Sequence, residues 1–519
     1  MDLQTEKEVI DYEENLNGAL TKNAKKNYVN YRHGRRVLKV PLSEETLNEV
    51  TVQKYLPYVL RNHAYNAEDV RHFDALYRGM MNIEDKTRPY DSSKSNSIVI
   101  ENHIQYMIEF KKGYMYGNPV KYSVDDDSVS TDDLSYLNRY MKDAKKAKKD
   151  IMLAENVYKY GNAYRMILPR IKKNINLQKE SPFSIYNLDN SYTFVVYGAD
   201  YREKKIFAGY ITELDSVTPL SHEYEVVVYT RTHIYKYICY SLYPTWEELT
   251  LKSIAKNNLG LIPIVEFYTN SARLGICDIA EPFNDAINAV SSDSVDAVSD
   301  FVNSILLLEN TTIDKETKRA VEEAGAMSIQ TNDPSKPARA SYLINQLSQQ
   351  DVIAKHEHLI KWMYNIVGVP QPTQKSTSGG DTGEARELGG GWENANIVAN
   401  QHEEPLKEGD MLCLEVALEI CKQKPNCPLN ELYVSDIEIN FNRTRNNNIM
   451  TKTQSLQTLI SMDMPYEVAL NIVGLTGNTH EVAQLWEANK GKNLDHNELE
   501  KEEDEETNNN VNQDTKALK

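Results

Sequence analysis

The sequence predicts an α+β fold, because its helical and strand patterns fall in separate stretches of the chain. Residues 1–80, 98–112 and 135–160 show helical patterning, whereas residues 163–268 hold short alternating or β-branched runs separated by Gly, Asp and Pro. Two long helices follow that β region, each with one apolar stripe. This segregation of helices from an antiparallel β region is the pattern of an α+β protein.

The bulk composition describes a large acidic protein. Its 519 residues allow two to four domains or one extended subunit, and its formal net charge is −18. Such a charge argues against a surface coated with DNA-binding groups. The last part of the chain, residues 491–519, is polar and acidic, and we expect it to be disordered.

The cysteines and the N-terminal residues indicate in which cellular compartment the protein folds. Five cysteines without a CxxC pair argue against a disulfide framework or a zinc site and favour a reducing compartment. Residues 1–30 lack an apolar h-region, and the longest apolar runs are far too short to span a bilayer. We therefore expect a soluble cytosolic product with no membrane partner.

The first half of the chain begins with helical elements. Residues 98–112 predict a helix with its apolar side formed by Ile100, Ile104, Met107 and Ile108. A turn at 117–119 and a strand at 120–124 follow. A single helix is expected over 135–160, and we interpret its lysine run as a solvated face rather than a nucleic-acid patch. The run comprises Lys142, Lys145, Lys146, Lys148 and Lys149.

The second half predicts long helices around a loop. Pro282 suits the first turn of a helix that runs to Ile305, and a short strand is expected at 306–308. A second helix spans about 347–367 and ends at Gly368. Beyond it we expect a loop at 370–381, a helix at 383–424 kinked near Pro405, a strand at 432–441, and short helices at 446–461, 465–473 and 479–489.

Enzyme signatures are missing from the sequence. There is no G-x-x-x-x-G-K-[ST] loop and no G-x-S-x-G elbow, so neither ATP hydrolysis nor a serine hydrolase is expected. His356 and His358 are two residues apart and point to different faces of a helix, so they do not form a metal pair. We expect no enzyme activity, no metal and no cofactor.

The order of these pieces resembles the portal protein family of long-tailed bacteriophages, over residues 71–490. Four stretches carry the resemblance: 96–120 with its basic-Gly-Tyr-x-x-Gly-x-Pro segment, 279–307, the two helices flanking 370–381, and 437–443. The resemblance implies a portal fold with an α/β wing, a two-helix stem, a small α/β clip, a tunnel loop and a helical crown. By that comparison, the wing comprises 1–282 and 383–440, the stem 283–305 and 346–368, the clip 306–345, the tunnel loop 369–382 and the crown 441–490.

Three acids of the first stem helix form a candidate site. Asp293, Asp296 and Asp300 are spaced by three and four residues and therefore share one helix face. One interpretation is a solvated face. The other is a channel lining that repels phosphates and keeps DNA free to slide, because each phosphate contact adds salt-dependent affinity.

Two further candidate sites lie in the expected loop and clip. The loop is either a surface linker or a projection that touches the DNA backbone without reading sequence. Its candidate contacts are Thr373, Gln374, Lys375, Ser376, Thr377 and Ser378. The clip bases are either a solvated face or a contact for the terminase or a connector. They are Lys315, Lys318, Arg319, Lys336 and Arg339.

The resemblance also implies a function and partners. The chain is expected to form a homododecameric ring at the portal vertex of the virion capsid, the conduit for packaging and ejection of double-stranded DNA. Its expected partners are the terminase large subunit, the scaffold and major capsid proteins, and the head-completion or tail connector protein. The alternative is a non-enzymatic ring or scaffold protein that binds nucleic acid outside a virion.

Overall fold

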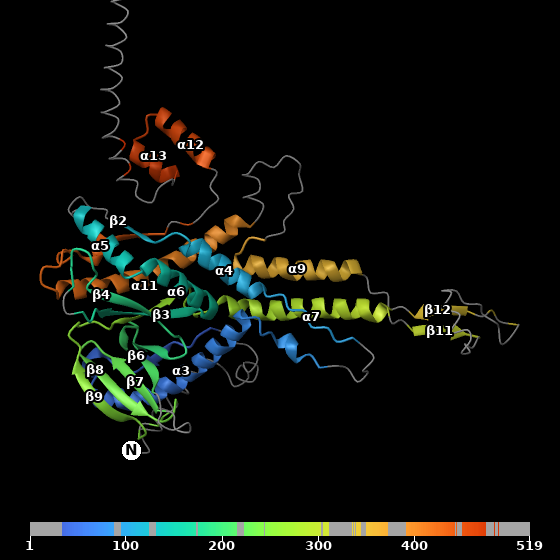
Figure 1. Ribbon diagram of the computed structural model, residues 1–519, viewed down its shortest axis with the longest axis horizontal. Coiled ribbons are helices and arrows are strands. Elements are labelled where there is room, and N and C mark those ends of the chain that lie inside the picture. The colour runs from blue at the N-terminus through green and yellow to red at the C-terminus, as the bar shows by residue number, and fades with distance from the viewer. Residues whose placement is uncertain are drawn as a thin grey trace, which may run out of the picture.

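The computed structural model shows a broad body from which two helices project side by side (Figure 1). α7 and α9 form this projecting pair, the hairpin of β11 and β12 lies beyond their far ends, and α12 and α13 lie above the body. The structure describes residues 34–87, 95–123, 131–172, 175–214, 223–242, 244–245, 247–302, 305–310, 335, 337, 339–343, 349–371, 391–441, 443, 449–473, 482 and 486.

Four helices make up the N-terminal part of the body: α3 (Glu49–Tyr77), α4 (His103–Tyr116), α5 (Thr131–Asp143) and α6 (Lys146–Tyr160). Asn48 caps α3 by accepting a hydrogen bond from the Thr51 amide at 2.9 Å. Two short 3-10 turns, η2 (Glu44–Thr46) and η3 (Asn82–Asp85), flank α3.

Two of the predicted helices have different bounds. α4 begins only at His103, and residues 95–102 are extended, so the expected helix start at 98 was wrong. Ile100 is exposed as a result and does not join the apolar side. The helix expected over 135–160 is two helices, because Lys145 has a left-handed φ of 57° that no α-helix accommodates.

A six-stranded sheet forms the lower part of the body, with the strand order β1-β5-β6-β7-β8-β9. The strands are β1 (Leu38–Val40), β5 (Thr193–Gly198), β6 (Lys205–Leu214), β7 (Glu223–Tyr229), β8 (His233–Cys239) and β9 (Thr250–Lys256). All neighbours are antiparallel except β1, which pairs with β5 in parallel. α3 covers one face through Val52, Leu56, Val59 and Leu60. The antiparallel β region is thus confirmed.

A smaller sheet connects the helices of the body. It has the order β10-β3-β4, formed by β3 (Asn162–Pro169), β4 (Phe183–Leu188) and β10 (Ile264–Tyr268). α6 and α11 (Trp392–Lys422) pack against it. β2 (Lys121–Ser123) pairs with β13 (Glu438–Asn440), and η4 (Val434–Asp436) precedes β13. The strand expected over 432–441 is therefore shorter than predicted.

The projecting pair consists of α7 (Ile276–Val302) and α9 (Gln349–Val367), and the hairpin of β11 (Ile305–Glu309) and β12 (Arg339–Leu343). α7 starts before Pro282, so the expected start was wrong. Asp278 holds the first turn by accepting the Gly275 amide at 2.8 Å, and Cys277 and Ala280 are buried there. The helices α12 (Ile449–Ser461) and α13 (Tyr466–Val473) match two of the predicted short helices; the third lies almost wholly outside the described residues.

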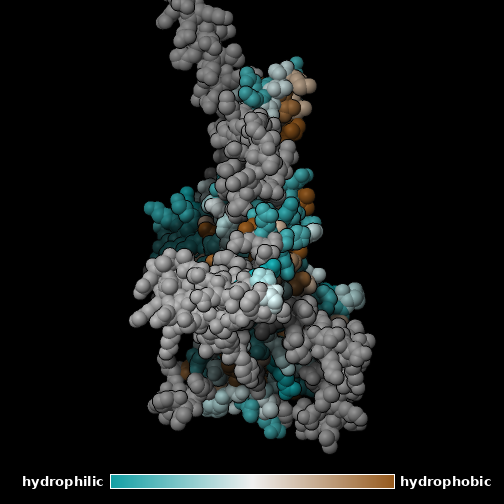
Figure 2. Space-filling view, turned by 90° about the vertical axis from the view of Figure 1, so that its right-hand side faces the viewer, coloured by the Kyte–Doolittle hydropathy of each residue, from teal (hydrophilic) through white to brown (hydrophobic). Residues whose placement is uncertain are grey.

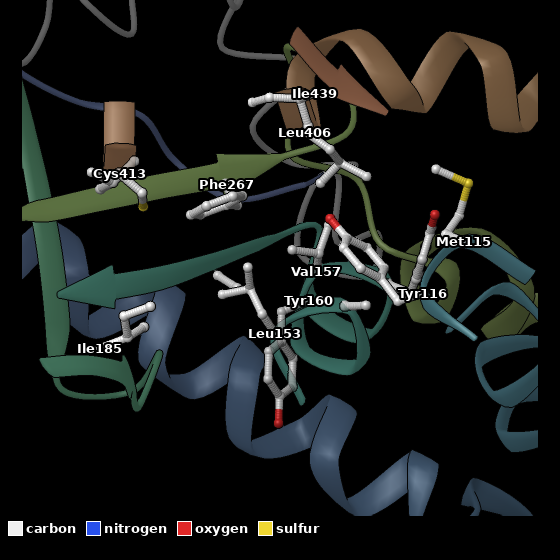
Figure 3. Close-up of a cluster of buried hydrophobic side chains, with 14 of the residues drawn as sticks. Met115, Tyr116, Leu153, Val157, Tyr160, Ile185, Phe267, Leu406, Cys413 and Ile439 are labelled. Carbon is white, nitrogen blue, oxygen red and sulfur yellow. The ribbon is translucent and has the colours of Figure 1, made fainter. Parts of the chain in front are cut away.

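Figure 3 shows how one core unites these elements. Its labelled side chains come from α4, α6, β4, β10, α11 and β13, and they include Met115, Leu153, Ile185, Phe267 and Ile439. All five cysteines are buried and free of disulfides. Segments from both halves of the sequence contribute to this core, while two separate apolar clusters lie between α3 and the six-stranded sheet and between the two sheets.

A buried ionic cluster lies within this core. Arg165 Nη1 contacts Asp150 Oδ1 at 2.8 Å, and Lys146 Nζ bridges Asp150 at 2.8 Å and Asp410 at 3.0 Å. The Tyr122 hydroxyl donates to Asp410 at 2.9 Å. Lys146 is therefore buried, which corrects the solvated-face interpretation at that residue, whereas Lys142, Lys145 and Lys148 are exposed as expected. Two cations and two carboxylates balance, as burial of charge requires.

Candidate functional site

The candidate site is the junction between the body and the projecting helices. α7 buries Ile287 against the body, and α9 buries Met363, Tyr364 and Val367 in the same core. Between them and α4 lies an extended segment, residues 95–102, which we call the strap. The strap follows α7 and joins the projecting pair to α4.

Four hydrogen bonds attach the strap and the start of α4 to one face of α7. Alternate backbone N–H groups donate to side chains spaced four residues apart on the helix: Ser97 to Asp296 at 2.6 Å, Val99 to Ser292 at 3.0 Å, Glu101 to Asn288 at 2.8 Å, and His103 to Asn284 at 3.3 Å. Two extended residues advance about 6.6 Å and four helical residues about 6.0 Å, so the two repeats stay matched over this length. We call this set of bonds the ladder.

The Glu101 carboxylate gathers side chains from three elements. It accepts hydrogen bonds from Ser291 of α7, from His356 Nε2 of α9 at 3.0 Å and from His103 Nε2 of α4 at 3.1 Å. Burial alone would raise the pKa of Glu101, but the hydrogen bonds from Ser291 and the two histidines hold it below its usual value. The other nitrogen of His103 lies 3.1 Å from the Tyr364 hydroxyl. One ionised carboxylate thus ties both projecting helices to α4.

Two of the predicted channel acids contact Lys86. Its Nζ lies 3.0 Å from Asp293 and 2.9 Å from Asp296, and these contacts raise the pKa of Lys86, the hydrogen bond that Lys86 donates to Asp296 most. Desolvation would raise the pKa of Asp296, but Lys86 and Ser97 lower it. The side chain of Asp296 is 15% exposed and that of Asp293 is 73% exposed. Asp300 lies in α7, and its side chain is outside the described part of the structure.

The other predicted contacts lie mostly outside the described residues. This holds for the whole candidate loop set from Thr373 to Ser378 and for Lys315, Lys318, Arg319 and Lys336. Arg339 is exposed in β12, and it lies opposite Glu309 of β11 in the antiparallel strand register.

The sequence interpretation missed the polar ladder. It followed the apolar stripe of α7 and grouped Asp296 with the other acids, although Asn284, Asn288 and Ser292 are fully buried. The signal was present as four hydrogen-bonding residues at a constant spacing of four. Buried polar side chains need partners, so such a row indicates that a backbone segment lies along it.

The described residues show little that suggests catalysis. No group of three or more His, Cys, Asp or Glu side chains is placed there to hold a metal ion. His356 is engaged with Glu101, and the His358 ring lies against Trp362 with 5.9 Å between centroids. Over the same described ranges, no helix has the length and apolarity needed to cross a bilayer.

These features define a structural subunit, in which an apolar core and a polar ladder hold a pair of projecting helices. The chain belongs to a family of phage proteins. The family described as "Phage portal protein, SPP1 Gp6-like" matches residues 56–495, most of the sequence. No curated protein matches the chain. Portal proteins are structural proteins of the phage capsid, which agrees with the expected absence of enzyme motifs.

Proposed function

We propose that this portal protein assembles into a closed ring at one capsid vertex and serves as the conduit through which DNA is packaged and ejected. In this proposal α7 and α9 are the stem, the β11–β12 hairpin belongs to the clip, and α12 and α13 belong to the crown. Head-to-tail contacts between identical subunits close into a ring when the rotation between neighbours allows it, and we expect twelve copies.

Exposed apolar side chains on the projecting helices support the ring. Trp362 and Ile366 are one helical turn apart on α9 and are each about half exposed, at 51% and 49%, and Val295 and Val298 of α7 are comparably exposed. Large apolar side chains that share a face of a projecting helix indicate a protein contact. In the proposed ring, neighbouring stems cover them.

Electron microscopy of the purified protein tests this proposal. We expect annular particles with a central hole for the wild type and for Asn365→Asp, which adds a charge beside the apolar stripe. Ile366→Asp places the same charge within the stripe and should reduce rings at least tenfold, because burying an unpaired carboxylate between subunits is costly. Monomers of the wild type under every condition, with none of the protein in virions, would contradict the proposal.

The proposal extends to partners in the same assembly. Arg339 and the other clip bases would contact the terminase large subunit during packaging and the head-completion or tail connector protein afterwards. Scaffold and major capsid proteins would surround the ring at the vertex. The candidate loop would touch double-stranded DNA without sequence preference, because hydroxyls and a single lysine reach phosphates rather than base edges.

A further inference from the structure

A groove runs along the outward face of α11, remote from the projecting helices. It has a volume of about 770 Å³, and an adjoining depression of about 410 Å³ shares Met411 and Ser435 with it. The buried side chains of Leu418 and Leu432 are part of its lining. Met411 and Leu412 stand at its edge, each 39% exposed. The groove itself is lined mostly by apolar surface, whereas the adjoining depression is about equally polar and apolar.

The helix that lines this groove also carries a row of acids. Glu404, Glu408, Glu415 and Glu419 line the two depressions, and their spacings of four, seven and four place them on one side of α11. Within the described part of the chain, Glu408 and Glu415 form no salt bridge.

The bases of the same surface are already engaged. Lys407 pairs with Glu403 at 3.0 Å and with Glu404 at 3.6 Å, and Lys422 lies over the Tyr433 ring at 4.2 Å from its centroid. The groove therefore combines apolar side chains with two acids, Glu408 and Glu415, that flank Met411 and Leu412 and form no salt bridge among the described residues, and Lys422 is a base of its lining.

We propose that this α11 groove docks a basic peptide segment of a separate protein. An apolar side chain of that segment inserts among Met411, Leu412 and Tyr433, and its flanking lysines or arginines pair with Glu408 and Glu415. Grooves of this kind bind amphipathic segments through apolar anchors, while complementary charge gives specificity and speeds association.

The same charges disfavour two other occupants. Nucleic acid would bring its phosphates against the acids. A second copy that presented the same groove would bring acid against acid. A basic segment with an apolar anchor satisfies both the apolar centre and the carboxylates.

Peptide binding to the full-length protein tests the assignment. The probe is a fluorescent 14-residue synthetic peptide with two leucines flanked by four lysines, and binding is followed by anisotropy. Charge reversal at Glu408→Lys with Glu415→Lys should weaken binding at least tenfold. Met411→Ser should weaken binding severalfold without any change of charge. Glu393→Lys, an exposed acid of α11 outside the groove, should leave the affinity unchanged.

A photo-crosslinking form of the probe locates the contact. A benzophenone in place of one leucine should label Met411 or Tyr433, as read by mass spectrometry. Equal affinity for the charge-reversed variant and the Glu393→Lys control, or cross-links away from α11, would overturn the proposal. A peptide with the sequence of residues 19–33 has four bases and no acids. If it bound more tightly than the synthetic probe, the groove would be assigned to this segment of the chain itself, and the proposal of a separate protein partner would be overturned.

Discussion

At the scale of single residues, Lys111 is the most unusual side chain of the body. It is 1% exposed on α4, and among the described residues its Nζ has no hydrogen-bond partner. It lies beside Gly368, where a Cβ would come within 3.4 Å of Nζ. Desolvation lowers the pKa of Lys111 to about 8, and the charge of Lys111 adds to the desolvation that lowers the pKa of His402 to about 4. A buried cation without an acceptor destabilises the fold.

Replacing Lys111 by methionine should therefore stabilise the protein at pH 7. A lowered pKa penalises the charged form, so the deficit is fully present below about pH 8 and disappears as the pH rises toward 10.5. The shift corresponds to about 3 kcal/mol, and we expect a gain of about 1–3 kcal/mol in the free energy of unfolding. Urea denaturation at pH 7 and at pH 9.5 measures the gain, which should shrink at the higher pH.

The neighbouring lysine provides a matched control. Lys112 Nζ contacts Glu109 at 2.6 Å and Glu155 at 3.2 Å, so Lys112→Met should destabilise the protein or leave it unchanged. An equal gain from both substitutions would show that general hydrophobicity, and not the unpaired charge of Lys111, sets the effect.

At the scale of elements, the ladder holds the strap and the start of α4 against α7. Ser292→Ala removes the acceptor of the Val99 amide and leaves a partly buried N–H without its partner, at a cost of about 1 kcal/mol. Hydrogen exchange should show the amides of residues 97–101 opening about fivefold more often. Ser294→Ala is the control, because that hydroxyl donates to the Val290 carbonyl of its own helix and, within the described residues, takes no part in the ladder. Unchanged protection in Ser292→Ala would mean that the ladder does not hold the strap.

Periodicity predicted the elements whose pattern is purely apolar. The strands β3 to β10 occupy the β region expected over 163–268, and α9 begins close to the expected start at 347, because alternation and helical stripes report directly on burial. The break between α5 and α6 escaped prediction, since Lys145 adopts a left-handed conformation that its side chain does not signal. The strap was mistaken for helix because Ile98 and Ile100 extend the helical pattern of α4, although both are exposed.

The candidate site was predictable only in part. The shared face of Asp293 and Asp296 followed from their spacing, but the contact with Lys86 did not, because that residue is more than 200 positions away in sequence. Long-range polar partners depend on the tertiary fold. The same reason hid Lys146 in the ionic cluster with Asp410.

At the scale of the whole molecule, the acids of α7 test the role of the channel. Asp293→Asn combined with Asp300→Asn removes negative charge from the proposed lining, and packaging should become slower because phosphates then dwell longer against the stem. Rings should still form. Packaged DNA per particle over time, measured by nuclease protection, checks the effect, and normal kinetics would count against a channel-facing position.

Asp296 needs a separate variant. Its carboxylate accepts hydrogen bonds from Lys86 and from the Ser97 amide, so Asp296→Asn should lower stability and loosen the strap in addition to any effect on DNA. If Asp296→Asn alone impaired packaging, the role of Asp296 would be to attach the strap, and a channel-lining role for Asp293 and Asp300 would be contradicted.

The chain also has a distinct surface near α12 and α13. Figure 2 shows apolar side chains gathered at the top of the molecule over these helices, where Met462, Val468 and Ile472 are exposed. In the proposed ring these exposed apolar side chains would belong to the crown, where they could contact a neighbouring subunit.

The buried cysteines make the protein convenient for site-directed labelling. Cys239, Cys277, Cys413, Cys421 and Cys427 all lie out of reach of solvent, so a maleimide dye should react with an introduced thiol at an exposed position such as Lys361 long before it reaches the natural ones. Fluorophores placed there on every subunit would report distances around an annulus, and with them the number of copies it contains.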